Sequence, residues 1–140
     1  MKSTTKREFL LKFFIAVSVI STFIHNVDNY VHFDQYPQPD WITPSGIIRS
    51  WFIWTIIGIA GYLFYKNQQF RLSYFCLIIY SSCGLSSLGH YLYGRVDEFS
   101  SAMNLFILTD GLAGFAVLGF ALWSIPFLRE RFRKPITEID

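Results

Sequence analysis

Four side chains that can transfer protons or bind metal ions stand within long apolar stretches of this sequence. They are His25, Asp28, His90 and Asp110. A charged side chain near the centre of a bilayer costs on the order of 2.5–3.5 kcal/mol, so each of these groups needs a compensating partner or a function. Asp110 is the clearest case, because long apolar runs flank it on both sides. We expect Asp110 to face the protein interior and to pair with His25 or His90.

Three kinds of chemistry fit these four residues. Imidazole nitrogens with carboxylate oxygens suit a zinc, iron or manganese ion that keeps one position open for water or substrate. Without a metal, a histidine oriented by an aspartate can move a proton on an amphiphile that enters the bundle. A haem b held between His25 and His90, with Gly84, Gly111 and Gly114 leaving room for the macrocycle, ranks last because it needs no carboxylates.

A structural interpretation competes with these three. Polar groups on neighbouring membrane helices can form a hydrogen-bond network that holds the bundle together, at about 0.6 kcal/mol for each bond. The serines, threonines and glycines of this chain fit that role, whereas four ionisable groups exceed what helix adhesion needs. We therefore predict a site at the four residues, catalytic or metal-binding. The predicted ligand contacts beside it are Asn29, Trp54, Ser87 and Tyr91.

Composition places the chain in a membrane. Of 140 residues, 52% are apolar and 16% charged, against about 25% charged in soluble domains, and the mean hydropathy is +0.34. A hydrocarbon core of about 30 Å requires about 20 apolar residues of helix. Four stretches meet this requirement, at about 9–30, 47–65, 72–93 and 102–126. The sequence predicts one domain over 1–140, an all-α bundle of four transmembrane helices.

Basic residues predict the orientation of the bundle. They gather before the first span, between the second and third, and after the fourth: Lys2, Lys6, Arg7, Lys12, Lys66, Arg71, Arg129, Arg131, Arg133 and Lys134. Arg49 and Arg95 alone fall on the other side, so the positive-inside rule predicts both termini in the cytoplasm. We expect a bacterial plasma (inner) membrane. The alternative of a cleaved signal peptide ending near Ser21 is disfavoured, because Lys12 interrupts its apolar region.

Helical spacing joins the polar residues of each span into faces. Residues three and four apart share one side of a helix. The predicted faces are Ser18, Ser21, Thr22, His25, Asp28, Asn29 and His32 on the first span and Cys83, Ser86, Ser87, His90 and Tyr91 on the third. At about 1.5 Å of rise per residue, the four ionisable groups all fall in the outer half of the membrane.

The longest connection, about 31–45, carries Pro37, Pro39 and Pro44. Proline fixes φ, so this segment should be stiff and non-helical. Two interpretations stay open. The segment folds over the outer mouth of the bundle as a lid, or Tyr36 and Trp41 simply form part of an aromatic belt at the interface.

The pattern His25-x-x-Asp28-Asn29, followed by Tyr36-Pro37 and Trp41, resembles the small multi-pass membrane proteins that carry an H-x-x-E-E motif. That family is of unknown function. Asn29 stands where the motif has its second glutamate. The resemblance implies a site at His25 and Asp28.

The functional hypothesis is a multi-pass membrane protein whose His/Asp site binds a metal ion or the polar head of a lipid-like ligand, with acid/base or hydrolytic chemistry on it. The alternative is a non-catalytic membrane subunit or accessory protein held together by interhelical hydrogen bonds. Whether the chain is an enzyme stays open. Membrane lipid or a small amphiphile is the expected partner, and a homo-oligomer is compatible with the sequence. Nucleic acid is excluded, since no basic patch carries interleaved exposed aromatics.

Overall fold

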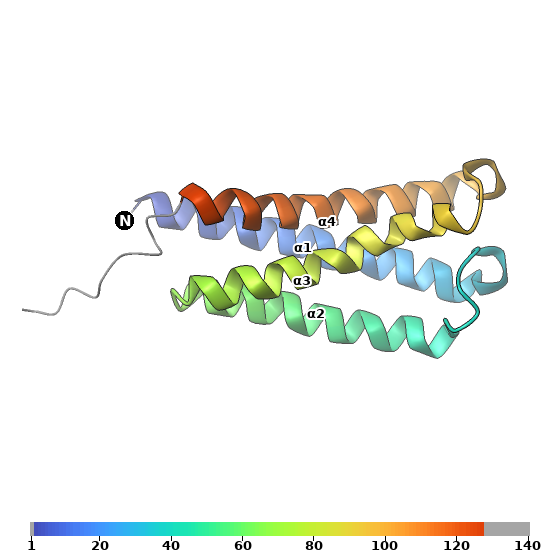
Figure 1. The fold of residues 1–140 in the computed structure, drawn as a ribbon, viewed down its shortest axis with the longest axis horizontal. Helices are drawn as coiled ribbons and strands as arrows, with labels where there is room; N and C mark the ends of the chain where they lie inside the picture. Colours follow the sequence, from blue (N-terminus) through green and yellow to red (C-terminus); the bar gives the residue numbers. More distant parts are fainter. Residues whose placement is uncertain (1, 128–140) are drawn as a thin grey trace, which may run out of the picture.

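The computed structural model describes residues 2–127 and is built almost entirely of helix (Figure 1). Four long helices are α1 (Lys2–Val31), α2 (Pro44–Lys66), α3 (Phe70–Ser87) and α4 (Ser101–Phe127), and three short 3-10 helices are η1 (Phe33–Gln35), η2 (Leu88–Leu92) and η3 (Val96–Glu98). Within this described part there is no strand. All four spans are long and apolar enough to cross a membrane, so the prediction of an all-α four-helix bundle is confirmed.

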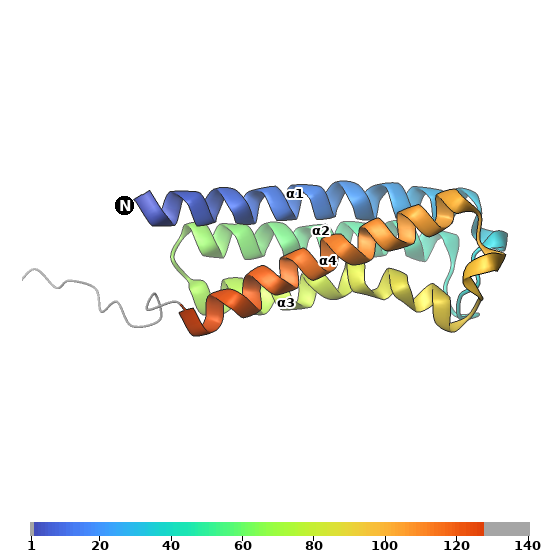
Figure 2. The ribbon, with the colours of Figure 1, turned by 90° about the horizontal axis from the view of Figure 1, so that it is seen from above.

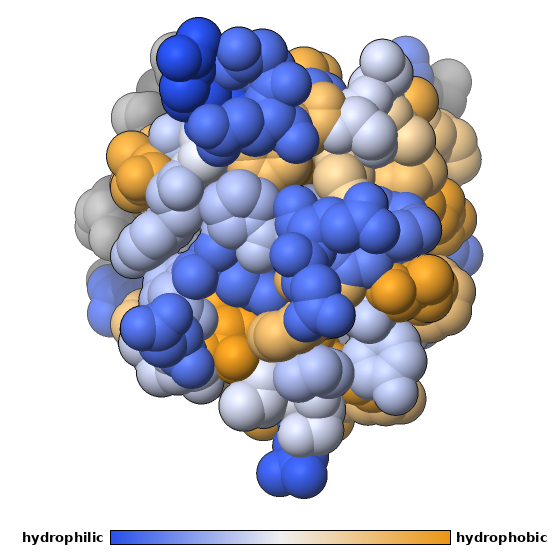
Figure 3. All heavy atoms as spheres, turned by 90° about the vertical axis from the view of Figure 1, so that its right-hand side faces the viewer, coloured by the Kyte–Doolittle hydropathy of each residue, from blue (hydrophilic) through white to orange (hydrophobic). Residues whose placement is uncertain are grey.

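The helices run alternately up and down, so the start of α1, the α2–α3 turn and the end of α4 share one end of the bundle (Figures 1 and 2). We call the opposite end, formed by residues 32–43 and 93–100, the distal end. It presents mainly polar side chains, as Figure 3 shows. α1 and α3 each pack against both α2 and α4 but hardly against each other. α2 and α3 lie farther apart at the distal end than at the other end of the bundle (Figures 1 and 2).

The start of α2 is fixed by a local cap. The Thr43 hydroxyl accepts a hydrogen bond from the Gly46 backbone N–H at 3.1 Å, and Pro44 occupies the first helical position. Both features are favoured at helix N-termini, because the first N–H groups have no partner inside the helix. The cap decides where the connection from α1 ends and α2 begins.

Two apolar clusters fill the bundle and leave a polar layer between them. One lies toward the termini and consists of Leu11, Ile15, Tyr65, Tyr74, Leu77, Tyr80, Val117, Phe120 and Ala121. The other, at the distal end, consists of Tyr36, Phe99, Met103 and Ile107. Along α4, Asp110 stands between Ile107 of the second cluster and Val117 of the first. The ionisable residues thus interrupt a core that is otherwise apolar.

The polar face of α1 is narrower than the spacing predicts. Ser18, Thr22, His25 and Asn29 are buried, at successive steps of four, three and four residues. Ser21, Asp28 and His32 share the predicted face but are only half-buried. The interior stripe is thus about one residue wide, and Asp28 lies at its margin.

The third span departs from the predicted continuous α-helix. It ends as α-helix at Ser87 and continues as the 3-10 helix η2, which contains His90. In a 3-10 helix residues three apart eclipse, so His90 lies in line with Ser87. The Ser87 hydroxyl lies 2.6 Å from the Gly84 carbonyl oxygen and 2.9 Å from the Ile107 carbonyl oxygen of α4. The tighter winding therefore keeps His90 on the interior side, where it is buried.

Close backbone contact between α3 and α4 depends on two glycines. A Cβ atom at Gly84 would lie 2.6 Å from the Asp110 carbonyl oxygen, and one at Gly114 would lie 2.8 Å from the Leu85 amide nitrogen. These distances are too short for any side chain. The interpretation of Gly111 and Gly114 as part of a close-packing surface is consistent with this contact, which also holds the backbone of Asp110 against α3.

We predict that Gly84→Ala destabilises the bundle by about 1–3 kcal/mol, the usual cost of overpacking, because α3 and α4 must separate. The free energy of unfolding in mixed micelles, measured by titration with a denaturing detergent, checks this. Gly119→Ala is the matched control on α4, since nothing lies within 4 Å of its added Cβ atom. Equal stability of the two variants would contradict the contact.

The N-in/C-in orientation stays a prediction. A reporter fused after Asp140 should be active on the cytoplasmic side and silent when it requires export. A reporter inserted between Thr43 and Pro44 should give the opposite result. Residues 128–140, which hold the basic cluster after the fourth span, lie outside the described residues.

Candidate functional site

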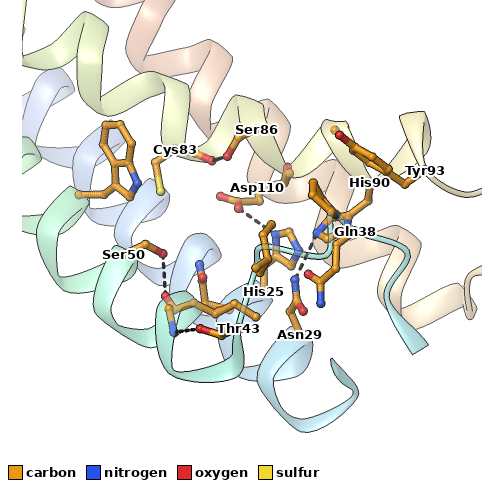
Figure 4. Close-up of a pocket in the computed structure, with 18 of the residues that line it drawn as sticks. His25, Asn29, Gln38, Thr43, Ser50, Cys83, Ser86, His90, Tyr93 and Asp110 are labelled. Atoms are coloured by element: carbon orange, nitrogen blue, oxygen red, sulfur yellow. Dashed lines mark hydrogen bonds and ion pairs between the residues drawn. The ribbon is translucent and has the colours of Figure 1, made fainter. Parts of the chain in front are cut away.

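The site is built around a buried, hydrogen-bonded histidine–aspartate pair between α1 and α4. His25 Nδ1 lies 3.0 Å from Asp110 Oδ2, and the side chains are only 6% and 2% exposed (Figure 4). The sequence leaves the partner of Asp110 open between His25 and His90, and the structure pairs it with His25. Because a histidine whose Nδ1 faces a carboxylate donates from that nitrogen, Asp110 fixes both the ring orientation and the position of its proton.

Each member of this pair keeps one atom without a partner. His25 Nε2 and Asp110 Oδ1 are buried and accept no hydrogen bond from any described residue. With Nδ1 donating to Asp110, Nε2 is the ring nitrogen left without a partner. A buried polar atom without a partner costs about 1–3 kcal/mol, so a bundle that keeps two of them beside each other calls for a functional reason.

His90 differs from His25 because both of its ring nitrogens are engaged. Nδ1 lies 2.9 Å from the Pro37 carbonyl oxygen, and Nε2 lies 3.2 Å from Asn29 Nδ2. A carbonyl oxygen can only accept and an amide nitrogen can only donate, so Nδ1 donates and Nε2 accepts. His90 is therefore a neutral imidazole that joins α1, η2 and the connection between α1 and α2.

That connection, residues 32–43, which we call the strap, lies across the distal end of the site. Tyr36 is only 4% exposed, and its ring centroid lies 5.8 Å from that of His25 and 5.0 Å from that of His90. Gly94 faces Pro37 so closely that a Cβ atom on it would lie 2.5 Å from Pro37 Cγ. The buried Tyr36 therefore fits a segment folded over the site, whereas Trp41 is 79% exposed and remains compatible with an interfacial belt.

Asp28 fastens the strap and is not part of the predicted cluster. Its Oδ2 accepts a hydrogen bond from the Tyr36 hydroxyl at 2.6 Å, and its Oδ1 lies 3.0 Å from His32 Nδ1. Burial, the hydrogen bond to Asp28 and the negative charge of Asp28 together raise the pKa of Tyr36, which keeps its phenol protonated as the donor. On a helix Asp28 is rotated by about 60° from His25, and this rotation turns it out of the site.

A cavity of about 690 Å³ adjoins the histidine pair and lies within the usual size range of ligand pockets. It is lined by α1 (His25, Asn26, Asn29), the strap (Gln38, Pro39, Trp41, Ile42, Thr43), α2 (Gly46, Ile47, Ser50, Trp54), the α3–η2 segment with the residue after it (Cys83, Ser86, Ser87, Gly89, His90, Tyr93) and α4 (Asp110). Ser86 is exposed on α3, so the cavity extends to the outside of the bundle.

The predicted ligand contacts are met in part. Asn29, Trp54 and Ser87 line the cavity. Tyr91 does not, because its hydroxyl donates to Asn104 Oδ1 at 2.8 Å on the far side of η2. The change from α-helix to 3-10 helix at Ser87 rotates Tyr91 away as it turns His90 inward.

Sequence reasoning missed Gln38, and it placed Cys83 on the polar face of the third span without predicting it as a ligand contact. Gln38 belongs to an irregular segment without periodicity, so its direction has no sequence signal beyond the prolines beside it. Cys83 stands four residues before Ser87 on one helix face, and this spacing was the signal available for it. Asn26, rotated by about 100° from His25, also contributes to the wall.

The residues do not fit the metal or haem interpretations. Among residues 2–127 no group of three histidine, cysteine, aspartate or glutamate side chains is arranged to share a metal ion. Asp28 is committed to the strap, and His90 has no free nitrogen. A haem bound by both histidines does not fit either, because His90 has no nitrogen left to bind iron. The two rings also lie edge to face, with their centroids 5.4 Å apart. Gly84 and Gly114 are filled by the neighbouring backbone, which leaves no room for a macrocycle beside them.

No protein-family model, curated protein or solved structure matches this chain. The resemblance to proteins with an H-x-x-E-E motif therefore stays a prediction. Functional inference has to come from the geometry of His25, Asp110 and the cavity beside them.

We predict that His90→Phe loosens the strap while it keeps an aromatic ring at this position. The change removes the donor to Pro37 and the acceptor for Asn29 Nδ2, which should lower the free energy of unfolding by about 1–3 kcal/mol and speed amide hydrogen exchange over residues 33–42. Exchange followed by mass spectrometry is the measurement. In the control Tyr30→Phe, which changes an exposed ring on α1 just before the strap, strap exchange should stay close to wild type. Unchanged exchange in His90→Phe would contradict the assigned role of His90.

Proposed function

We propose that this protein is a membrane-embedded binding protein whose cavity takes the polar head of an amphiphile and sets it against the Nε2 atom of His25. The observation that carries the proposal is the His25–Asp110 pair. Nδ1 is held by the carboxylate at 3.0 Å, and Nε2 is buried, without a partner and next to a cavity of about 690 Å³.

The unpartnered Nε2 of His25 is a hydrogen-bond acceptor for the head group of a ligand. A neutral imidazole oriented by a carboxylate offers its second nitrogen as a strong acceptor, and this is also the arrangement by which histidines take protons from substrates. An O–H or N–H group of a bound head would satisfy Nε2 and would be polarised by it. The pair therefore serves binding directly and leaves the site equipped for proton transfer.

The position of the cavity supports a ligand with an apolar tail. Pro37, Gln38 and Pro39 of the strap cover the distal end, whereas exposed Ser86 places part of the cavity wall at the surface of a span. An amphiphile can pass between α2 and α3 with its tail in lipid and its head inside. A water-soluble ligand would have to displace the strap.

The rival interpretation, a network that only holds helices together, accounts for one half of the site. His90 fits it, since all its hydrogen-bonding capacity joins Asn29 to Pro37. His25 fits it less well, because its Nε2 has no partner among the described residues, whereas buried polar groups are usually paired. A subunit or accessory role is compatible with the proposal but has no separate support.

The test follows the His25 nitrogen directly. Protein labelled with ¹⁵N-histidine in phosphatidylcholine nanodiscs is titrated with ten-carbon amphiphiles that carry alcohol, amine or carboxylate heads. At least one head should move the His25 Nε2 resonance saturably, because a hydrogen bond to a bare ring nitrogen changes its shielding. The His90 resonances should move far less, since both its nitrogens are already engaged.

Decane at the same membrane mole fraction is the control for tail effects, and His25→Gln assigns the resonance. If none of the three heads moves His25 Nε2 more than decane does, the proposed function is wrong. Saturable shifts at His90 with none at His25 would likewise overturn it.

A further inference from the structure

The buried, unpartnered side-chain atoms of the residues that line the cavity are all acceptors. Four buried atoms of lining residues have no partner among the described residues: His25 Nε2, Asn29 Oδ1, Gln38 Oε1 and Asp110 Oδ1. Three are oxygens that can only accept, and the fourth is the ring nitrogen whose neighbour Nδ1 already holds the proton. A ligand that satisfies them has to donate several hydrogen bonds.

Five side-chain donors of the same wall are already used. The hydroxyls of Ser50, Ser86 and Ser87 donate to carbonyls of their own helices at 2.6–2.7 Å. The side-chain amides of Asn26 and Gln38 donate to the Thr22 and Phe33 carbonyl oxygens. A carboxylate or phosphate head would therefore compete with these carbonyl oxygens for the five donors and would meet the unpartnered acceptors as well.

The charged residues in and near the cavity also favour a cationic ligand. Asp110 is the only aspartate, glutamate, lysine or arginine among the lining residues. Around the distal rim of the bundle, residues 28–50 and 93–100 carry five carboxylates (Asp28, Asp34, Asp40, Asp97, Glu98) against two guanidinium groups (Arg49, Arg95). An excess of negative charge at the rim raises the local concentration of cations. Trp41, Trp54 and Tyr93, whose rings suit a cation, also line the cavity.

We propose that the ligand is an amphiphilic primary amine, whose ammonium head donates hydrogen bonds to Asp110 and to the unpartnered acceptors beside it. This inference rests on the proposed function and narrows it to one chemical class. An ammonium supplies three N–H donors and a positive charge in one small group, which matches an acceptor-rich wall around a single carboxylate. A neutral alcohol supplies one donor, and a quaternary ammonium supplies the charge without any donor.

The test compares heads on one tail in the nanodisc titration of His25 Nε2. Decylamine, which is protonated at neutral pH as lysine is, should reach half-saturation at a mole fraction at least about tenfold lower than decanol. Decyltrimethylammonium should be weaker than decylamine by a similar factor, since it has no N–H to donate. Decanoate should be the weakest.

Asp110→Asn keeps the shape of the side chain and removes its charge. The substitution should weaken the binding of decylamine by about 10- to 100-fold, while the binding of decanol should change by only a few fold. The reason is that charge-assisted hydrogen bonds are stronger than neutral ones. Asp34→Asn, at an exposed rim carboxylate that does not line the cavity, is the matched control and should change decylamine binding by less than about threefold.

The outcomes separate the two proposals. Equal half-saturation for decylamine and decanol, or for decylamine and decyltrimethylammonium, overturns the amine assignment while the binding site stands. A preference for decanoate overturns it as well. If the His25 Nε2 resonance moves with none of the heads, the proposed function itself is wrong. The comparison of heads uses wild-type protein, so it decides the question even if Asp110→Asn folds poorly.

Discussion

The burial of Asp110 is the constraint on which the rest of this structure depends. A carboxylate in the middle of a membrane helix has to be compensated, and breaking such a buried pair typically costs about 3–5 kcal/mol. The compensation comes from His25, on a helix 85 positions away in sequence. For the two to meet, α4 has to approach the centre of the bundle closely. The glycine contact at Gly84 and Gly114 provides that approach, because backbone there replaces side-chain volume.

The His25–Asp110 pair lies in a polar layer between the two apolar clusters. Between the terminal-end cluster around Leu77 and Tyr80 and the distal cluster around Ile107, the interior is polar and incompletely filled. In lipid, apolar side chains gain little from clustering, so packing and satisfied polar contacts hold such bundles together. A layer that keeps buried acceptors unsatisfied works against that stability. Such local violations of packing rules are characteristic of functional sites.

Much of the fold could be predicted because the bilayer restricts the choice so strongly. Span length and hydropathy identified four helices, and the expectation that Asp110 turns inward to a histidine was correct. Asp28 was misassigned, since a spacing of three residues leaves a rotation of about 60° that only packing resolves. Tyr91 was misassigned because the switch to 3-10 helix at Ser87 has no clear sequence signal. Gln38 could not be found at all, because an irregular segment has no period to follow.

Gly94 links the two distal connections into one body. Because no Cβ atom fits between Gly94 and Pro37, the strap between α1 and α2 lies in direct contact with the segment between α3 and α4. The bonds of Tyr36 to Asp28 and of His90 to Pro37 close the same ring of contacts. Opening the roof of the cavity therefore requires several contacts to break together, which makes it slow. A molecule held beneath this roof would therefore exchange with the bilayer and not with the water above the distal end.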